Sequence, residues 1–321
     1  MALCLACGEK GWPARPADYE FVSPTYIDEI LAPRRDGLHY ECCRDFGESS
    51  RDFIEDGEVG VDNAVTALFD GLAIFIGLNF QDQIDANIES GNLALVLDHA
   101  FYEKQEEPFT LVAHQVDFAE GTTWQSAHQG GGHFRVREES FMPGSGVPWG
   151  RFSEAVIDAG GTLRGSGGSL VWGLSVLGVP FRARIRDVRV EAKRQEDGEG
   201  WVRYTEGTLS GFLTLDDFYE GLNNEIARGC DCLGLTEPVY YKNVDGIWDT
   251  RCVSEAHTRC TRPEEKRCGD LTTTGANGPW LCEIILDVIQ DAADLDLDGD
   301  PSRYEAASLG LFWSSVPAVM D

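Results

Sequence analysis

Apolar residues recur every three or four positions in four stretches of the chain. This spacing predicts helices over residues 62–76, 80–90, 215–227 and 279–293. The stretch 62–76 is apolar on nearly every side, so we expect this helix to be buried. The other three stretches each have one apolar face, and we expect these faces to pack on a sheet.

Between residues 92 and 213 the pattern changes to an alternation of apolar and polar residues, which is typical of β-strands. We predict strands over 92–97, 109–118, 133–137, 169–177 and 181–192. In the last of these, arginines alternate with apolar residues, and a phase shift at Asp187 indicates a β-bulge. We expect these arginines to pair with carboxylates on a neighbouring strand, and the alternative is that they bind an anionic ligand.

These elements predict an α+β fold with an antiparallel β-sheet or sandwich core, packed helices and a disulfide-rich insertion. Residues 308–316 are predicted to form a closing strand of the sheet, so we expect 59–321 to be a single domain. Residues 8–58 are polar and weakly periodic, and we interpret them as an extended lead-in. The cysteine-rich region 230–278 is interpreted as an insertion within the domain.

The charge of the chain is strongly one-sided. Its 321 residues include 26 basic and 55 acidic side chains, which gives a net charge of -29. Nucleic-acid binding depends on lysine and arginine, so this balance excludes a nucleic-acid partner. An anionic membrane surface would also repel the chain. No apolar run reaches the roughly 20 residues that cross a bilayer, so we expect membrane attachment only through a lipid anchor.

Ten cysteines are present, and six of them lie between residues 230 and 282. Such density favours disulfides in a segment that buries little of itself. Zinc is the alternative, but no pair in this segment has the C-x2-C spacing, and His257 is the only histidine nearby. We expect separate partners for the adjacent Cys42 and Cys43, because a bond between them closes a strained ring. The cysteines predicted to form four disulfides are Cys42, Cys43, Cys230, Cys232, Cys252, Cys260, Cys268 and Cys282.

The first seven residues are similar to the end of a bacterial signal segment with a lipobox, in which the small Ala6 precedes Cys7. We therefore interpret residues 1–7 as a signal and lipobox remnant and predict lipidation of Cys7. Signal peptides have roughly 15–30 residues, so we expect the true start to lie upstream. Removal of Cys4 and lipidation of Cys7 leave eight cysteines for pairing. The predicted location is extracytoplasmic, as an outer-membrane lipoprotein or a secreted protein; the alternative is an ordinary apolar N-terminus.

Residues 294–305 fit the calcium-loop pattern D-x-D-x-D-G-x5-E at every required position. Gly299 allows the sharp turn of such a loop. Pro301 and the strand predicted after the loop differ from an EF-hand, so we expect one structural Ca2+ site. The alternatives are an acidic turn without metal and a phosphatase-like Asp-x-Asp nucleophile. The predicted ligands are the carboxylates of Asp294, Asp296, Asp298 and Glu305, the carbonyl of Asp300, and Ser302 through a water.

The sequence predicts no catalytic residue. No H-E-x-x-H, G-x-S-x-G or phosphate-binding glycine motif is present. His128 and His133 flank three glycines, and we interpret this segment as a hairpin tip; the alternative is a metal site. The glycines between residues 160 and 168 are interpreted as turn glycines.

Three segments carry a resemblance to a known group: Glu55–Asn63, Leu177–Phe181, and Ser308–Phe312 after the Asp-rich loop. With these segments the chain resembles predicted lipoproteins of the myxobacterial type over roughly residues 55–230 and 280–321. The resemblance implies a surface location and calcium binding, and it implies no particular activity.

Together these features favour a non-catalytic, calcium-stabilised lipoprotein of the bacterial cell surface or periplasm, with a binding or scaffolding role. A surface protein or a polysaccharide is the expected partner. One alternative is an extracellular hydrolase whose acidic residues lie at the Gly-rich rim near 129–168. The other is a carrier of an apolar ligand within the sheet. A buried carboxylate pair favours the hydrolase, a continuous apolar cavity the carrier, and a filled core with exposed aromatics the binding protein.

Overall fold

The computed structural model describes residues 11–33, 42–47, 50, 63–66, 68, 80–176, 179–196, 200–253, 259–262, 268, 281–300 and 303–321. The strands are β1 (Thr25–Leu31), β2 (Leu95–Ala100), β3 (Phe109–Phe118), β4 (Gly132–Val136), β5 (Gly150–Ile157), β6 (Thr162–Val176), β7 (Val179–Glu196), β8 (Val202–Thr214), β9 (Tyr240–Lys242), β10 (Trp248–Thr250) and β11 (Ala306–Met320). The helices are α2 (Phe80–Glu89), α3 (Trp124–His128), α4 (Leu215–Gly229) and α7 (Leu281–Ala292), with 3-10 turns at Pro16–Asp18, Glu138–Ser140 and Asp231–Leu233.

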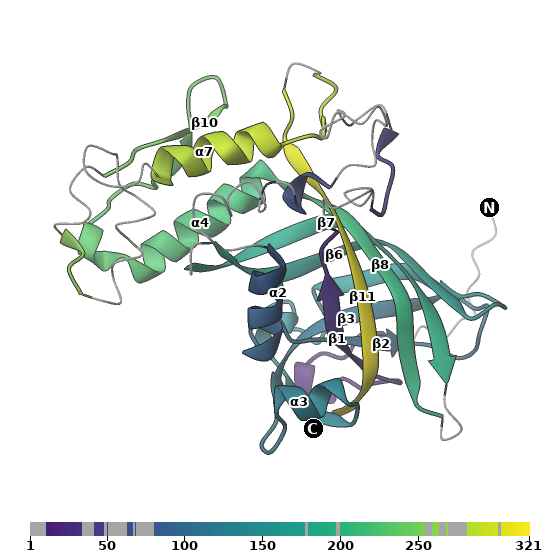
Figure 1. Ribbon diagram of the computed structural model, residues 1–321. Helices are drawn as coiled ribbons and strands as arrows, with labels where there is room; N and C mark the ends of the chain where they lie inside the picture. The colour runs from purple at the N-terminus through teal and green to yellow at the C-terminus, as the bar shows by residue number, and fades with distance from the viewer. Residues whose placement is uncertain are drawn as a thin grey trace.

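Eight strands form a closed β-barrel in the order β1-β2-β3-β5-β6-β7-β8-β11 (Figure 1). Antiparallel pairing of β3 with β5 and of β1 with β11 closes the ring. Strand β4 bridges β3 and β11 at one end, antiparallel to β3 and parallel to β11. The predicted α+β fold with a sheet or sandwich core is therefore wrong. The long strands curl the single sheet until it pairs with itself, so its hydrophobic face is buried without a second layer.

The interior of the barrel is filled by apolar side chains. Helix α2 contacts β1 and β6, which lie on opposite sides of the ring, so it closes one end of the interior. Gln81 fixes the helix to the end of β1, because its amide accepts from Ala32 N and donates to Ile30 O. At the centre, a cavity of about 10 Å³ has room for roughly one water. Its lining residues are Ile27, Ile30, Leu95, Leu170, Leu209, Leu311 and Trp313.

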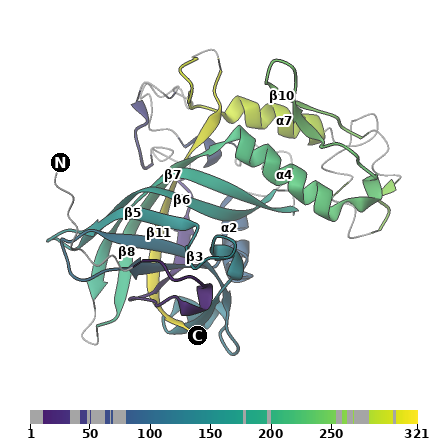
Figure 2. The ribbon, with the colours of Figure 1, turned by 180° about the vertical axis from the view of Figure 1, so that it is seen from behind.

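A helical unit packs beside the barrel. Helices α4 and α7 lie side by side in Figures 1 and 2, and Tyr219 on α4 donates to the carbonyl of Leu286 on α7 at 2.9 Å. Thr214 caps the start of α4, because its side chain accepts from Asp217 N. Strands β9 and β10 form a small hairpin next to this helical pair.

Several predicted elements are confirmed and others differ. Helices predicted at 80–90, 215–227 and 279–293 correspond to α2, α4 and α7. For 62–76, only 63–66 and 68 belong to the described residues, and 64–66 and 68 are helical. Strand β1 lies inside the predicted lead-in; a register shift between Ile27 and Glu29 interrupts its alternation and conceals it in the sequence. None of the helices in the described part of the chain is long and apolar enough to span a membrane.

Candidate metal site

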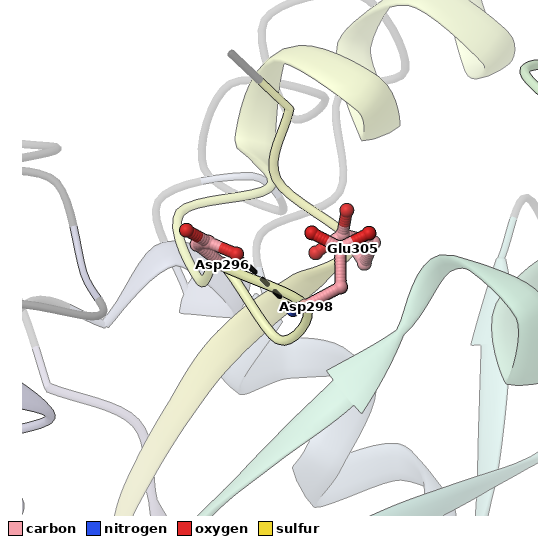
Figure 3. Close-up of side chains that lie close together, drawn as sticks. All are labelled: Asp296, Asp298 and Glu305. Atoms are coloured by element: carbon pink, nitrogen blue, oxygen red, sulfur yellow. Dashed lines mark hydrogen bonds between the residues drawn. The ribbon is translucent and has the colours of Figure 1, made fainter. Parts of the chain in front are cut away.

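The loop between α7 and β11 is held at its base by a short antiparallel bridge. Asp294 N and Leu295 N both donate to Ala306 O at 2.9 Å, and Glu305 N donates to Leu295 O at 2.9 Å. Leu295 is also almost fully buried. This bridge fixes the two ends of the loop, so Asp296, Asp298 and Glu305 lie close together (Figure 3).

Three of the predicted ligands meet in this loop. Asp296, Asp298 and Glu305 each offer a carboxylate oxygen, and these oxygens lie within 4.8 Å of one another (Figure 3). The backbone turns around Asp296, whose Oδ1 accepts from the N–H groups of Asp298 and Gly299 at 3.1 and 2.6 Å. Gly299 has a φ of +88°, the left-handed conformation that the motif assigns to glycine at this place.

Glu305 is the residue of the cluster whose surroundings best fit a role as a cation ligand. Its Oε2 accepts from Leu297 N at 2.9 Å. Its Oε1 is buried and has no hydrogen-bond partner among the described residues. A buried carboxylate oxygen without a partner is costly, and a bound cation is one way to satisfy it. Carboxylate oxygens are the ligands that Ca2+ prefers, so the residues that are present fit this ion.

The other predicted ligands have different surroundings. Asp294 is fully buried, and its two carboxylate oxygens accept from Ser308 N at 2.7 Å and from Ser308 Oγ at 2.6 Å. It therefore points toward β11 and does not belong to the cluster in Figure 3. The carbonyl of Asp300 accepts from Arg303 N at 3.0 Å. Ser302 lies outside the described residues.

The eight cysteines predicted to form disulfides are paired, and Cys7 lies outside the described residues. Cys42 bonds to its neighbour Cys43, so the expectation of separate partners is wrong. The physical reason is that the other six cysteines satisfy one another within the helical unit. Their pairs are Cys230–Cys268, Cys232–Cys260 and Cys252–Cys282, with Cα atoms 5.2 to 5.9 Å apart.

His128 and His133 do not meet at a metal site. His128 ends α3 and faces Asp28 at 3.4 Å, whereas His133 lies on β4 and contacts Asp321 at 2.8 Å. The glycines between them connect α3 to β4. They lie in the connection between the antiparallel strands β3 and β4, as a hairpin predicts, but this connection contains a helix and is not a tight tip. Within the described ranges, the acidic loop holds the one group of three potential metal ligands whose ligand atoms lie within 4.8 Å of one another.

Strand β2 carries two buried titratable groups that the sequence pattern does not predict. Asp98 faces outward under the N-terminal segment, where it accepts from Tyr19 OH at 2.7 Å and from Val22 N at 2.5 Å. Burial raises the pKa of this carboxyl to about 7. His99 accepts from Tyr204 OH at 2.6 Å, and burial lowers the pKa of its imidazole to about 4. Adjacent strand residues point to opposite faces, so these two groups form no catalytic dyad.

His114 on β3 is the third such group. It is completely buried, and neither ring nitrogen has a hydrogen-bond partner within the described part of the chain. Burial lowers the pKa of its imidazole to about 3. Its ring is surrounded by Tyr19, Phe21 and Phe141, with centroid distances of 4.9, 5.4 and 5.4 Å. Nothing in the sequence pattern marks this histidine, because its burial depends on how the N-terminal segment packs over the barrel.

The described carboxylates that are almost fully buried, Asp98 and Asp294, lie on separate elements and bond to different partners. They therefore do not form the carboxylate pair that a hydrolase would require. The geometry instead singles out the acidic loop as the candidate site. Comparison with protein-family models, with curated proteins and with solved structures found no match for this chain.

Proposed function

We propose that the protein is a non-catalytic, calcium-stabilised binding protein of the bacterial cell surface or periplasm. The observation that carries the calcium part is the buried, unpartnered Oε1 of Glu305 beside the carboxylates of Asp296 and Asp298. Ca2+ accepts several oxygens in flexible geometry, which suits a short loop that combines carboxylates with backbone groups. A divalent ion would also offset part of the repulsion in a chain of charge -29.

Calcium at this place would join two parts of the molecule. Asp296 and Asp298 follow the end of α7, whereas Glu305 immediately precedes β11. The ion would therefore fasten the disulfide-bonded helical unit to the barrel. A site that forms only in the native state stabilises that state by about 2.7 kcal/mol when calcium is 100 times its Kd.

The proposed location rests on the cysteines. Four disulfides favour an oxidising compartment, and the segment that ends at Cys7 favours a lipid anchor there. The resemblance to myxobacterial-type lipoproteins supports the same location. The binding role is supported by a filled interior, since a cavity of about 10 Å³ is far below the roughly 300–1,000 Å³ of small-ligand sites. An apolar carrier is therefore the weaker alternative.

Thermal unfolding in excess calcium and in chelator tests the proposal. We expect calcium to raise the Tm of the wild type by about 5 °C, which corresponds to about 2.7 kcal/mol for a chain of this size. Glu305→Gln and Asp298→Asn should lose this increase. Asp300→Asn is the matched control, because it removes one charge from the same loop but keeps the Asp300 carbonyl. Identical wild-type melting curves in calcium and chelator would contradict the proposal.

A further inference from the structure

A groove on the outside of the barrel has the size of a ligand site. It has a volume of about 490 Å³ and lies over β5, β6 and β7, which are side by side in Figure 2. This volume falls within the roughly 300–1,000 Å³ of small-molecule sites. We call it the arginine groove and define it by Trp12, Trp149, Arg151, Ser153, Ser169 and Arg184.

The floor of the groove includes two glycines of β6. Strand β6 carries Gly167 and Gly168 there, and its register with β7 shifts on both sides of Gly168. A Cβ atom at Gly168 would collide with the ring of Phe152 and lie 2.8 Å from Arg151 O. Gly167 has a φ of +69°, which favours glycine. The sequence predicts turn glycines here, but both lie within a strand. Gly167 leaves the outer surface open, whereas Gly168 makes room for the ring of Phe152 in the barrel interior.

Two arginines of the groove have no carboxylate partner among the described residues. The Arg184 guanidinium donates to Ser169 Oγ at 3.3 Å, and that of Arg151 lies 5.9 Å from the centre of the Trp12 ring. Eight other described arginines form an ion pair with a carboxylate. Arg151 and Arg184 have no such partner among the described residues, so both guanidinium groups are available to an anionic ligand, for which guanidinium is well suited.

The acidic and basic neighbours of these arginines are already engaged. Asp187 lines the groove, but it forms an ion pair with Arg44 at 2.7 Å. Arg186, at the edge, bonds to both oxygens of Asp217 at 2.6 and 3.0 Å. Arg186 therefore pairs with a carboxylate, but this partner lies on helix α4 and not on a neighbouring strand as predicted. For Arg184 the alternative of an anionic ligand is favoured.

Two tryptophans contribute flat apolar surface to the groove. Trp149 is 39% exposed, which is unusual for so large a ring. Trp12 is held edge-on by Phe101, with ring centroids 4.9 Å apart. The C–H face of a sugar ring packs well on such a surface, while its hydroxyls bond to polar groups such as Ser153 and Ser169. Tryptophan combines an apolar ring face with a polar N–H at the ring edge, and it is therefore common in binding sites.

The groove is open and continues along the barrel. A second hollow of about 690 Å³ shares Gly167 and Asp187 with it and extends toward β8. Its lining includes Arg189, Thr208 and Ser210 and also the acidic Asp45, Glu154 and Glu191, of which Glu191 pairs with Arg164. A long, open, polar channel fits an extended chain of sugars better than a compact ligand.

We propose that the arginine groove binds an acidic polysaccharide, with its carboxylates at Arg151 and Arg184 and its sugar rings against Trp12 and Trp149. This inference rests on the binding role in the proposed function and names its ligand class. It does not depend on the calcium loop. The net charge of -29 repels a polyanion at long range, but the Debye length of about 8 Å at physiological salt confines that repulsion.

Isothermal titration calorimetry with trigalacturonate at physiological salt tests the inference. The titration is done in excess chelator with the wild type and with Glu305→Gln, so that loss of calcium binding and loss of saccharide binding are separate results. We expect equal saccharide binding in both proteins. Arg151→Gln and Arg184→Gln should each weaken it at least tenfold, which is the effect of losing one bond to a charged group. Arg135→Gln, an exposed arginine on β4, is the matched control.

Two further probes fix the ligand class. Maltotriose, a neutral trisaccharide, should bind at least tenfold more weakly than trigalacturonate, and so should hexaglutamate, an acidic peptide. The inference is overturned if trigalacturonate does not bind to the folded wild type, or if both arginine variants bind it like the control. Equal binding of maltotriose or hexaglutamate would also overturn it. Circular dichroism of each variant confirms that it is folded.

Discussion

Replacing Asp294 with alanine separates a structural role from a metal-binding role. The sequence motif places this residue first among the calcium ligands, whereas the structure bonds both of its carboxylate oxygens to Ser308 on β11. Asp294 is 0% exposed, so water cannot replace these bonds without opening the junction between α7 and β11. The structure therefore predicts that Asp294 stabilises the fold whether or not calcium is bound.

The expected magnitude follows from the two bonds. A hydrogen bond to a charged group contributes about 1.5–3 kcal/mol, so loss of both should cost about 3–6 kcal/mol. Ser308→Ala keeps the bond from the backbone N–H to Asp294, but it loses the bond from the hydroxyl and leaves the buried N–H of Ala64 without its acceptor. A cost of about 3–6 kcal/mol, similar to that of Asp294→Ala, is therefore expected. Since domains have a stability of roughly 5–15 kcal/mol, the Asp294→Ala effect should be large.

Urea unfolding followed by circular dichroism, in chelator and in excess calcium, measures both effects. Asp294→Ala should be less stable than the wild type in both conditions and should keep the full stabilisation by calcium. A variant with wild-type stability in chelator and no response to calcium would refute this reasoning, because that result identifies Asp294 as a ligand. Asp300→Asn again serves as the control in the same loop.

Two buried groups near the N-terminal segment give further predictions. His114→Phe should raise the free energy of unfolding at pH 7 by about 1–3 kcal/mol, since it removes unpartnered buried nitrogens. Because the pKa of His114 in the folded protein is lowered to about 3, the wild type should lose stability as the pH falls from about 6.5, and His114→Phe should lose less. Urea unfolding at pH 7 and pH 4 measures the stability of both proteins. An equal loss of stability in acid would contradict the prediction. The Asp98 pKa is raised to about 7, so the wild type should lose up to roughly 4 kcal/mol relative to Asp98→Asn as the pH rises from about 4 to 8. A constant difference between these two proteins over that pH range would show that Asp98 does not titrate in this way.

Local pattern was a good guide to individual elements. Helical spacing located α2, α4 and α7, and alternation located β3 and β7, because amphipathic periodicity reflects which face each element buries. The bulge predicted at Asp187 is confirmed by the register shift between Arg186 and Arg189. Closure of the sheet was not predictable in this way. It depends on strand coiling and on the β3–β5 and β1–β11 pairings, which join distant parts of the chain.

The candidate site was likewise predictable in its local pattern but not in its contacts with distant parts of the chain. The motif predicted that Asp296, Asp298 and Glu305 lie together, and the structure places their carboxylate oxygens within 4.8 Å of one another. The inward turn of Asp294 depends on Ser308 in the next strand, which the motif does not contain. The open floor of the arginine groove depends on the register of β6 with β7, so the glycines alone indicated only turns.

Calorimetric titration of calcium into chelator-stripped protein tests the central claim most directly. The account predicts one Ca2+ per chain, loss of that binding in Glu305→Gln, and wild-type binding in Asp300→Asn. Absence of bound calcium in the folded wild type, or equal binding by Glu305→Gln, would contradict it.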